Sequence, residues 1–279
     1  MLIDDIEIKD NNLIVEGRLN VVINSRNGLH CLNRYSPIGR SMMFYGEHAQ
    51  NELSFCHNFI EPGAVVLDVG AHQGTHTVSF SNSVGSAGRV FAFEPQRLMY
   101  QNLCASLALN SIENVSAFNA AVGSAPGKVK IAEFDYSKRA HFSGMRILPE
   151  NCGEEVPLIT LDYTVPKEFA ERVGFIKIDV EGMEMDVLEG AECIVSNTSP
   201  VIYCEYHKEV AGRASKDVVP FLKQKGYSLF LHEPAGYNPE NFFGYAGDRF
   251  MGGKDHNVVC IHKSMTEKFA SAVTSLEEV

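Results

Sequence analysis

The sequence predicts an α/β protein built on a doubly wound sheet, in which mostly parallel strands carry helices on both faces. From residue 64 onward, apolar runs alternate with glycine-containing turns and segments of helical periodicity, as in repeated βαβ units. The runs at 64–69 and 175–180 are almost continuously apolar, which is typical of strands buried on both faces. With 45% hydrophobic and 21% charged residues, a chain of 279 residues can bury a full core without disulfides or metal ions.

The first 50 residues differ from the rest and are predicted to form a small β extension. Apolar and polar residues alternate at 6–8, 13–15 and 19–23, which indicates short antiparallel strands. A helix is predicted at 47–60, because Pro62 and Gly63 follow it as breakers. We therefore predict a β extension at 1–50, one main domain at 51–265 and a polar C-terminal tail at 266–279.

The main domain is predicted to alternate strands and helices along its whole length. Apolar runs predict strands at 64–69, 89–94, 115–122, 129–134, 156–161, 175–180, 201–206, 227–231 and 257–261. Helical spacing of apolar residues predicts helices at 75–84, 95–110, 183–194 and 215–225. A polar loop at 135–155 lies between two of the short strands and is a candidate lid over the site.

Charge and cysteine usage exclude several classes of protein. Twenty-four Lys and Arg residues against 35 Asp and Glu give a formal net charge of −11, which disfavours broad binding to nucleic acid. No apolar run is long enough for a transmembrane helix, and the first ten residues lack the pattern of a signal peptide. The seven cysteines contain no CxxC pair, which indicates reduced thiols and a cytoplasmic location rather than disulfides or a zinc site.

The strongest motif is DVGAHQG at 68–74, directly after the first core strand. Glycines there let the backbone approach a ligand closely and turn into a helix, and Asp68 can meet a cationic ligand group. Glu94 ends the next strand, in FAFEP at 91–95, and its carboxylate can accept both hydrogens of a ribose diol. Together the two motifs predict a nucleoside site at the carboxyl edge of the sheet.

Two cofactors fit a nucleoside site of this kind. A dinucleotide requires G-x-G-x-x-G, and Ala71 and His72 break that spacing after Gly70. S-adenosylmethionine carries an ammonium, a sulfonium and a carboxylate but no phosphate, so the Asp-x-Gly-x-x-x-Gly turn suits it better. The plain structural alternative is a tight βα turn with an incidental acid at the strand end.

A second group of acids follows the fourth core strand, in KIDVEGME at 177–184. In a sheet of order 3-2-1-4-5, the first and fourth strands flank the topological switch point, so Asp68 and Asp179 are expected to border one crevice. A functional role competes here with a structural one, in which Lys177 and Asp179 form an ion pair and Glu181 caps a helix.

The next strand ends in YCEYH at 203–207, and alternation places Glu205 and His207 on one face. Both side chains can therefore reach the same crevice, although a single histidine is often only a surface or core residue. The loop residues Lys138, Arg139, His141 and Arg146 form a basic group in an acidic chain. They are expected either to hold an anionic part of the substrate or to be simply solvated.

These residues resemble the FkbM family of S-adenosylmethionine-dependent methyltransferases. The resemblance rests on VLDVGAHQGTHT, FAFEP, NAAVG, LITLD and FIKIDVEGMEMDVLEGA, in the order of that family and over about residues 55–210. It implies the class I methyltransferase (Rossmann-like) fold, with seven strands in the order 3-2-1-4-5-7-6 and the last strand antiparallel. It also implies O-methylation of a sugar or polyketide-type hydroxyl.

The resemblance also implies roles for individual positions. The first turn would hold the methionine end of the cofactor, Glu94 and the following proline the ribose, and the end of the third strand the adenine. His72 stands where the family usually has Asn, so that one contact is open. The implied cofactor-binding residues are Asp68, Gly70, Ala71, His72, Gly74, Thr75, Glu94, Pro95, Asn119, Ala120, Asp179 and Glu181.

We therefore expect an O-methyltransferase that acts on a hydroxyl of a sugar or another small polyhydroxylated acceptor. A hydroxyl needs a base within hydrogen-bond reach, and the candidates are Asp179, then His207, then Glu205, with Lys177 beside them. Asp179, Glu181 and Glu205 could also bind Mg²⁺, but nothing in the sequence fixes such a geometry, so no metal ligand is assigned. An NAD-dependent oxidoreductase and a non-catalytic binding module on the same scaffold are the alternatives, and the oligomeric state is not indicated.

Overall fold

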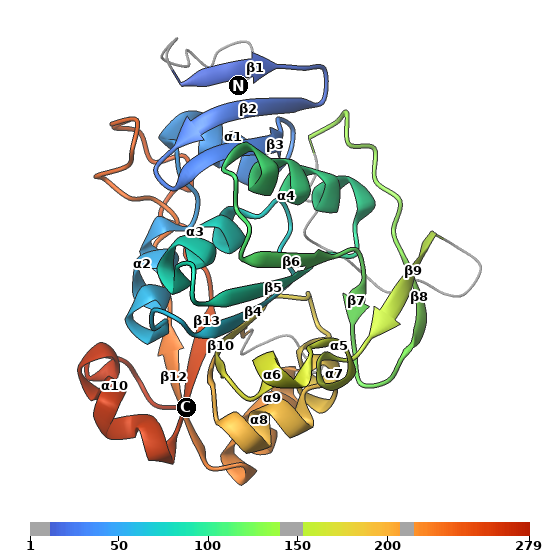
Figure 1. The fold of residues 1–279 in the computed structure, drawn as a ribbon. Helices are drawn as coiled ribbons and strands as arrows, with labels where there is room; N and C mark the ends of the chain where they lie inside the picture. The colour runs from blue at the N-terminus through green and yellow to red at the C-terminus, as the bar shows by residue number, and fades with distance from the viewer. Residues whose placement is uncertain (1–11, 140–152, 207–214) are drawn as a thin grey trace.

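A computed structural model describes residues 12–139, 153–206 and 215–279, and its centre is a seven-stranded sheet (Figure 1). The strand order is β12-β13-β11-β10-β4-β5-β6, and β13 runs antiparallel to both of its neighbours. This confirms the predicted order 3-2-1-4-5-7-6 with an antiparallel last strand. The strands are β4 (Val65–Val69), β5 (Arg89–Phe93), β6 (Val115–Phe118), β10 (Val173–Ile178), β11 (Val201–Glu205), β12 (Tyr227–His232) and β13 (Asn257–His262).

Helices cover both faces of this sheet, as the apolar runs predict. All five residues of β4 are buried, because its alternate side chains enter two different cores. One face packs against α5 (Leu161–Thr164), α7 (Glu184–Glu189), α8 (Glu192–Thr198) and α9 (Ser215–Gln224). The other packs against α2 (Gln50–Cys56), η2 (His57–Phe59), α3 (Thr75–Val84), α4 (Arg97–Leu109) and α10 (Thr266–Val273). The short helix α6 (Lys167–Ala170) precedes β10.

The N-terminal part contains more than the predicted strands. A three-stranded antiparallel sheet forms from β1 (Leu13–Glu16), β2 (Asn20–Ser25) and β3 (Gly28–Asn33), followed by helix α1 (Pro37–Tyr45). β3 and α1 were not predicted from the sequence, although Ser36 caps α1, a proline opens it and Gly46 ends it in the left-handed conformation. Hydrogen bonds join β3 to α4, from the Leu29 amide to Asn110 Oδ1 and from the Cys31 amide to Ser106 Oγ.

Two predicted elements are divided in the structure. The expected strand at 115–122 splits into β6 and β7 (Ala121–Val122), and β7 belongs to a small second sheet with β8 (Gly127–Ile131) and β9 (Glu154–Ile159). The expected helix at 183–194 splits into α7 and α8 around Gly190. A side chain at Gly190 would overlap the carbonyl oxygen of Gly123, so only glycine fits at the junction of the two helices.

The predicted polar tail at 266–279 includes helix α10. Phe269 and Val273 of α10 are buried, and Phe269 packs edge-on against Phe59 with 5.2 Å between the ring centroids. A long connection at 233–256, which we name the excursion, separates β12 from β13 and lies beside α1 (Figure 1). Among the residues described, no helix has the length and apolar character needed to cross a membrane.

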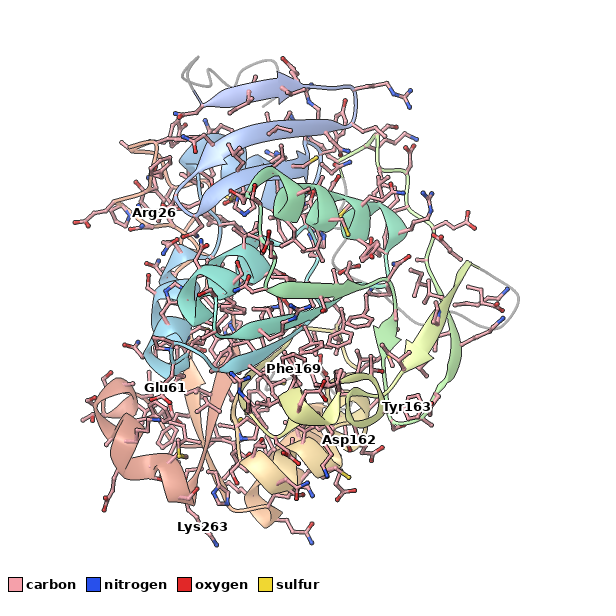
Figure 2. The ribbon with its side chains drawn as sticks, viewed as in Figure 1. Arg26, Glu61, Asp162, Tyr163, Phe169 and Lys263 are labelled. Atoms are coloured by element: carbon pink, nitrogen blue, oxygen red, sulfur yellow. The ribbon has the colours of Figure 1, made fainter. Side chains whose placement is uncertain are left out.

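The excursion is fixed to the N-terminal part by a buried carboxylate. Glu47 accepts hydrogen bonds from Arg26 Nε at 2.6 Å, Asn238 Nδ2 at 2.7 Å and the Phe242 amide at 2.9 Å. Arg26 also donates to the carbonyl of Glu240, and Figure 2 shows it at the boundary of these segments. Three stretches of chain far apart in the sequence therefore meet at one side chain.

Candidate functional site

Two cavities open at the carboxyl ends of the parallel strands, where β4 and β10 adjoin. The donor cavity, about 600 Å³, is mainly apolar and lies over the ends of β4 and β5. The acceptor cavity, about 620 Å³, is more polar and reaches β11 and β13. The residues common to both cavities are Ile38, Gly70, His72 and Asp179.

The turn at 68–74 adopts the tight geometry that its glycines predict. Gly70 has a φ of 83°, and a side chain there would overlap the carbonyl of Asp179 on the neighbouring strand end. Gly74 has a φ of 85° and packs directly against Leu103 of α4. Gly70 lines both cavities, whereas Gly74 allows α4 to pack closely behind the turn.

Glu94 lies at the edge of the donor cavity, and hydrogen bonds orient its carboxyl group. Its Oε2 accepts the His72 amide at 2.8 Å and its Oε1 accepts the Gln96 amide at 2.7 Å, so both carboxyl oxygens are fixed by the backbone. Burial raises the pKa of Glu94 to about 7, even though these two amides favour the charged form. The carboxyl group is therefore poised to titrate near neutral pH.

Asp68 and Lys177 form a layer of buried charges at the strand ends, and Lys177 lines the acceptor cavity. Asp68 accepts a hydrogen bond from Thr77 Oγ1 at 2.6 Å and lies 3.8 Å from Lys177 Nζ, and it lines neither cavity. Lys177 Nζ also lies 3.2 Å from Asp179 Oδ2. Burial favours the neutral amine, but Asp179 and Asp68 raise the pKa of Lys177 above its ordinary value. Lys177 is therefore an ammonium that stabilises Asp179 as an anion.

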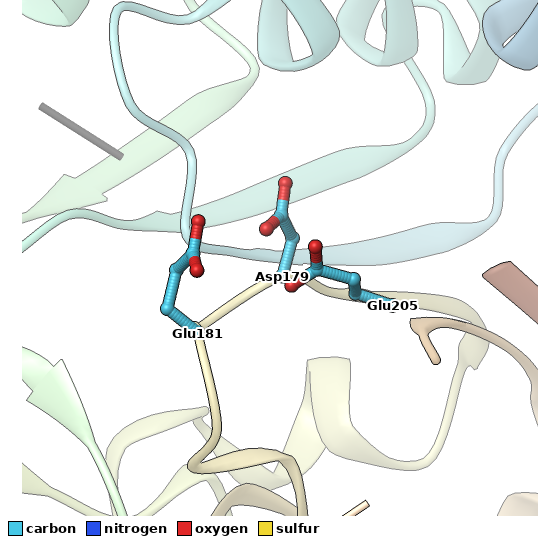
Figure 3. A group of neighbouring side chains, drawn as sticks. All are labelled: Asp179, Glu181 and Glu205. Carbon is cyan, nitrogen blue, oxygen red and sulfur yellow. The ribbon is translucent and has the colours of Figure 1, made fainter. Parts of the chain in front are cut away.

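Three carboxyl groups converge beside this layer, as the strand positions predict. Oxygens of Asp179, Glu181 and Glu205 lie within 4.8 Å of one another (Figure 3). Burial, then the charges of Asp179 and Glu181, raise the pKa of Glu205 to about 9. Burial also opposes the charge of Asp179, but Lys177 holds the pKa of Asp179 below its ordinary value. At neutral pH the pair therefore consists of an ionised Asp179 and a protonated Glu205.

Several residues of the acceptor cavity were not predicted from the sequence. Glu52 of α2 pairs with His76 of α3, with 2.9 Å between Oε1 and Nε2, and Asn257 Nδ2 donates to the other oxygen at 3.4 Å. His48 and Asp255 also line this cavity, and burial lowers the pKa of His48 to about 4. His76 lies only two residues beyond Gly74, and this position next to the predicted turn could have identified it as a site residue. The others come from segments with no motif.

The remaining predicted cofactor residues divide between the two cavities and the framework. Pro95 and Ala120 line the donor cavity, and Ala71 and Thr75 line the acceptor cavity. Asn119 instead donates from Nδ2 to the carbonyls of Glu94 and Pro95, at 2.8 and 2.9 Å, and so fixes the strand end.

The predicted base His207 lies outside the described residues, as do His141 and Arg146 of the basic loop. Of the other basic loop residues, Lys138 pairs with Asp135 at 2.9 Å. His72 has a φ of 49°, and burial lowers the pKa of its ring to about 3, so the imidazole facing both cavities is neutral.

Comparison with known proteins gives a family for this site. The model of the methyltransferase FkbM domain matches residues 68–229, more than half of the chain and the whole stretch from the first turn to β12. The match begins at the Asp68 turn and includes Glu94, Asp179 and Glu205. It decides against the NAD-dependent oxidoreductase alternative.

Individual relatives are distant and differ in length. The AMB antimetabolite synthetase AmbE of Pseudomonas aeruginosa is 26% identical over 63% of this chain and 10% of its own length. The methyltransferase sdnD of Sordaria araneosa is 24% identical over 46% of this chain and 60% of its own length. This chain thus spans a tenth of the first relative and three fifths of the second.

Solved structures that resemble this chain also share few identical residues with it. The methyltransferase FkbM of Methylobacillus flagellatus KT is 18% identical with a TM-score of 0.46, over 71% of this chain and 43% of that one. A precorrin-6y C5,15-methyltransferase from Geobacter metallireducens GS-15 is 14% identical with a TM-score of 0.48, over 76% and 87% of the two chains. On the extent of the family match, the chain belongs to the FkbM methyltransferase family.

Proposed function

We propose that the protein transfers the methyl group of S-adenosylmethionine to a hydroxyl of a sugar or another small polyhydroxylated acceptor. The observation that carries this proposal is the meeting of the two cavities at Gly70, His72 and Asp179. A donor in the apolar cavity and an acceptor in the polar one would face each other at that boundary. The hydroxyl as the site of methylation rests on the resemblance to the family.

The donor cavity fits S-adenosylmethionine on the evidence of its own residues. Gly70 lets the turn approach the Asp179 carbonyl at the cavity wall, where a side chain would overlap that carbonyl, and Glu94 offers fixed carboxyl oxygens to a ribose diol. The apolar wall formed by Phe93, Ala121 and Val122 suits the faces of an adenine ring. When bound, this cofactor supplies an electrophilic methyl group on a sulfonium.

Asp179 is the proposed base for the acceptor hydroxyl. It lines both cavities, and Lys177 keeps it ionised, so a carboxylate oxygen is available to take the proton. The protonated Glu205 nearby can donate a hydrogen bond without adding a second negative charge. Holding the hydroxyl in attack geometry contributes on the order of 7–11 kcal/mol to such reactions.

The direct test is titration calorimetry of the whole chain with S-adenosylhomocysteine, with NADH in parallel. We expect micromolar binding of S-adenosylhomocysteine and none of NADH. Glu94→Ala should abolish that binding, because the ribose loses its acceptor. Glu168→Gln, on the exposed surface of α6, is the matched control and should bind as the unchanged chain does. Absence of binding by the unchanged chain would favour the non-catalytic module.

Asp179→Asn tests the base. Turnover should fall by about 10²-fold or more, since proton removal is lost, while the affinity for S-adenosylhomocysteine stays within about twofold. Single-turnover assays at saturating donor measure this, and assays with and without a chelator separate a base from a Mg²⁺ ligand. Near-normal turnover in the variant would remove Asp179 from this role.

A further inference from the structure

Two polar side chains lie at the boundary of the donor and acceptor cavities. Of the residues that line both cavities, Ile38 is apolar and Gly70 has no side chain. Within the described part of the chain, His72 and Asp179 are therefore the residues that bring a polar side chain to both cavities. The proposed function uses Asp179 as the base and gives the ring of His72 no role.

The backbone holds His72 in an unusual conformation. The Gly74 amide donates to the Ala71 carbonyl at 2.9 Å, which closes a tight turn with His72 at its second position. The φ of His72 is 49°, in the left-handed region that residues with a side chain rarely adopt. Its amide donates to Glu94 Oε2 at 2.8 Å, so the donor side of the site also fixes the turn. Strained residues that are held in this way cluster at functional positions, which directs attention to the His72 side chain.

The ring nitrogens of His72 are available to a bound molecule. Both Nδ1 and Nε2 are buried, and neither makes a hydrogen bond with any described residue. Most buried polar atoms in folded proteins have a partner, so two unpartnered nitrogens on one side chain indicate a ligand contact. Burial lowers the pKa of the ring to about 3, so at neutral pH the ring is uncharged and carries one N–H and one bare nitrogen.

His72 and Asp179 offer complementary chemistry at the boundary. Lys177 Nζ lies 3.2 Å from Asp179 Oδ2 and keeps that carboxylate ionised, so it only accepts hydrogen bonds. No described protein group fixes the tautomer of His72, so its ring can donate to a hydroxyl oxygen or accept from a donor. His76, by contrast, is committed to Glu52, with 2.9 Å between Nε2 and Oε1, and lines only the acceptor cavity.

We propose that His72 is a catalytic residue whose ring donates a hydrogen bond to the acceptor hydroxyl at the position of methyl transfer. The inference rests on the proposed function and adds a second contact to the reacting oxygen. The hydroxyl proton passes to Asp179, and the His72 N–H engages one lone pair of the oxygen. The other lone pair forms the new bond to the methyl carbon, whose bond to sulfur breaks with its electron pair on sulfur. The ring gains and loses no proton, so it orients the hydroxyl and does not replace Asp179 as the base.

The test is titration calorimetry of the whole chain with S-adenosylhomocysteine and with sinefungin, an analogue of S-adenosylmethionine that carries an ammonium group at the position of the transferred methyl. The unchanged chain should bind sinefungin about tenfold more tightly or better, because Asp179 and the bare nitrogen of His72 can both accept from the ammonium. Glycine adopts a φ of 49° without strain, so His72→Gly keeps the turn. It should reduce the preference for sinefungin by about fivefold or more and change the affinity for S-adenosylhomocysteine by less than about twofold.

Two asparagine variants serve as comparisons. Asparagine tolerates the left-handed region and keeps a neutral donor and acceptor on a shorter side chain, so His72→Asn should retain part of the preference for sinefungin. His262→Asn, at the end of β13 that lies away from the site, should retain all of it. If His72→Gly fails to fold, nitrogen NMR of the histidine rings in the unchanged chain decides. Sinefungin, but not S-adenosylhomocysteine, should shift the ring signals that His72→Asn removes.

The outcomes separate the role of His72 from the proposed function. If the unchanged chain does not prefer sinefungin, if His72→Gly keeps the preference, or if the ring signals do not shift, the inference is wrong. Equal losses for both analogues in His72→Gly would assign the ring to cofactor binding alone and would also overturn it. If neither analogue binds the unchanged chain, the proposed function is refuted together with the inference.

Discussion

Glu94 should make ligand binding in the donor cavity depend on pH. Its pKa is raised to about 7 by burial, and a ribose diol is best bound by the ionised form, which only accepts hydrogen bonds. Affinity for S-adenosylhomocysteine should therefore rise by about tenfold between pH 6 and pH 8, as the carboxyl loses its proton. Calorimetry across this range measures the effect.

The Glu94→Gln variant is the control for this dependence. Its amide cannot titrate but retains an acceptor oxygen, so its affinity should be weaker and nearly independent of pH over the same range. A slope equal to that of the unchanged chain would assign the dependence to another group, such as Asp255, whose pKa burial raises to about 6.

Among single residues, the sequence could predict the convergence of Asp179, Glu181 and Glu205, because strand ends of a parallel sheet meet at one edge. It could not predict that Asp68 turns toward Lys177 and Thr77 rather than into a cavity. That direction depends on the packing of α3 behind the turn. The position of His48 in the acceptor cavity was also hidden, since it depends on how the segment after α1 folds back.

Gln73 connects three elements around the donor turn. It is fully buried, its Oε1 accepts the Asn33 amide and Asn102 Nδ2, and its Nε2 donates to Ser36 Oγ at 2.9 Å. Gln73→Ala should lower the free energy of unfolding by about 1–3 kcal/mol, because buried polar partners lose their hydrogen bonds.

Urea denaturation measures this, with Gln224→Ala at the exposed end of α9 as the control, for which we expect less than about 0.5 kcal/mol. A loss equal to that of the control would show that the N-terminal sheet is not coupled to the turn through Gln73.

Helices and strands could be predicted from the sequence where one local pattern dominates. They could not be predicted where a contact between distant residues sets their boundaries. The strands at 64–69 and 175–180 are apolar enough to be recognised alone. The Gly123 carbonyl that approaches Gly190 between α7 and α8 is distant in the sequence, so no local pattern contains this contact. Likewise, Asn119, between β6 and β7, donates to the carbonyls of Glu94 and Pro95, which are also distant in the sequence.

On the scale of the whole molecule, Glu47 joins the N-terminal sheet, α1 and the excursion. Glu47→Ala should lower the free energy of unfolding by about 2 kcal/mol, since three donors lose a shared acceptor. Hydrogen exchange should also speed up at the amides of Phe242 and its neighbours.

Glu240→Ala is the matched control, because only its backbone carbonyl takes part in this contact and its side chain is exposed. Equal stability of both variants would mean that other contacts with α1, such as the hydrogen bonds of Tyr45 and the aromatic pairs, hold the excursion.

The placement of the excursion has a consequence for how this scaffold can change. Because it connects two antiparallel neighbours, β12 and β13, its length can vary without altering the register of any parallel strand. It supplies Asp255 and His256 to the acceptor cavity and no residue to the donor cavity. Exchanging this one hairpin loop is therefore a route to chimaeras that keep the methyl donor and accept a different molecule.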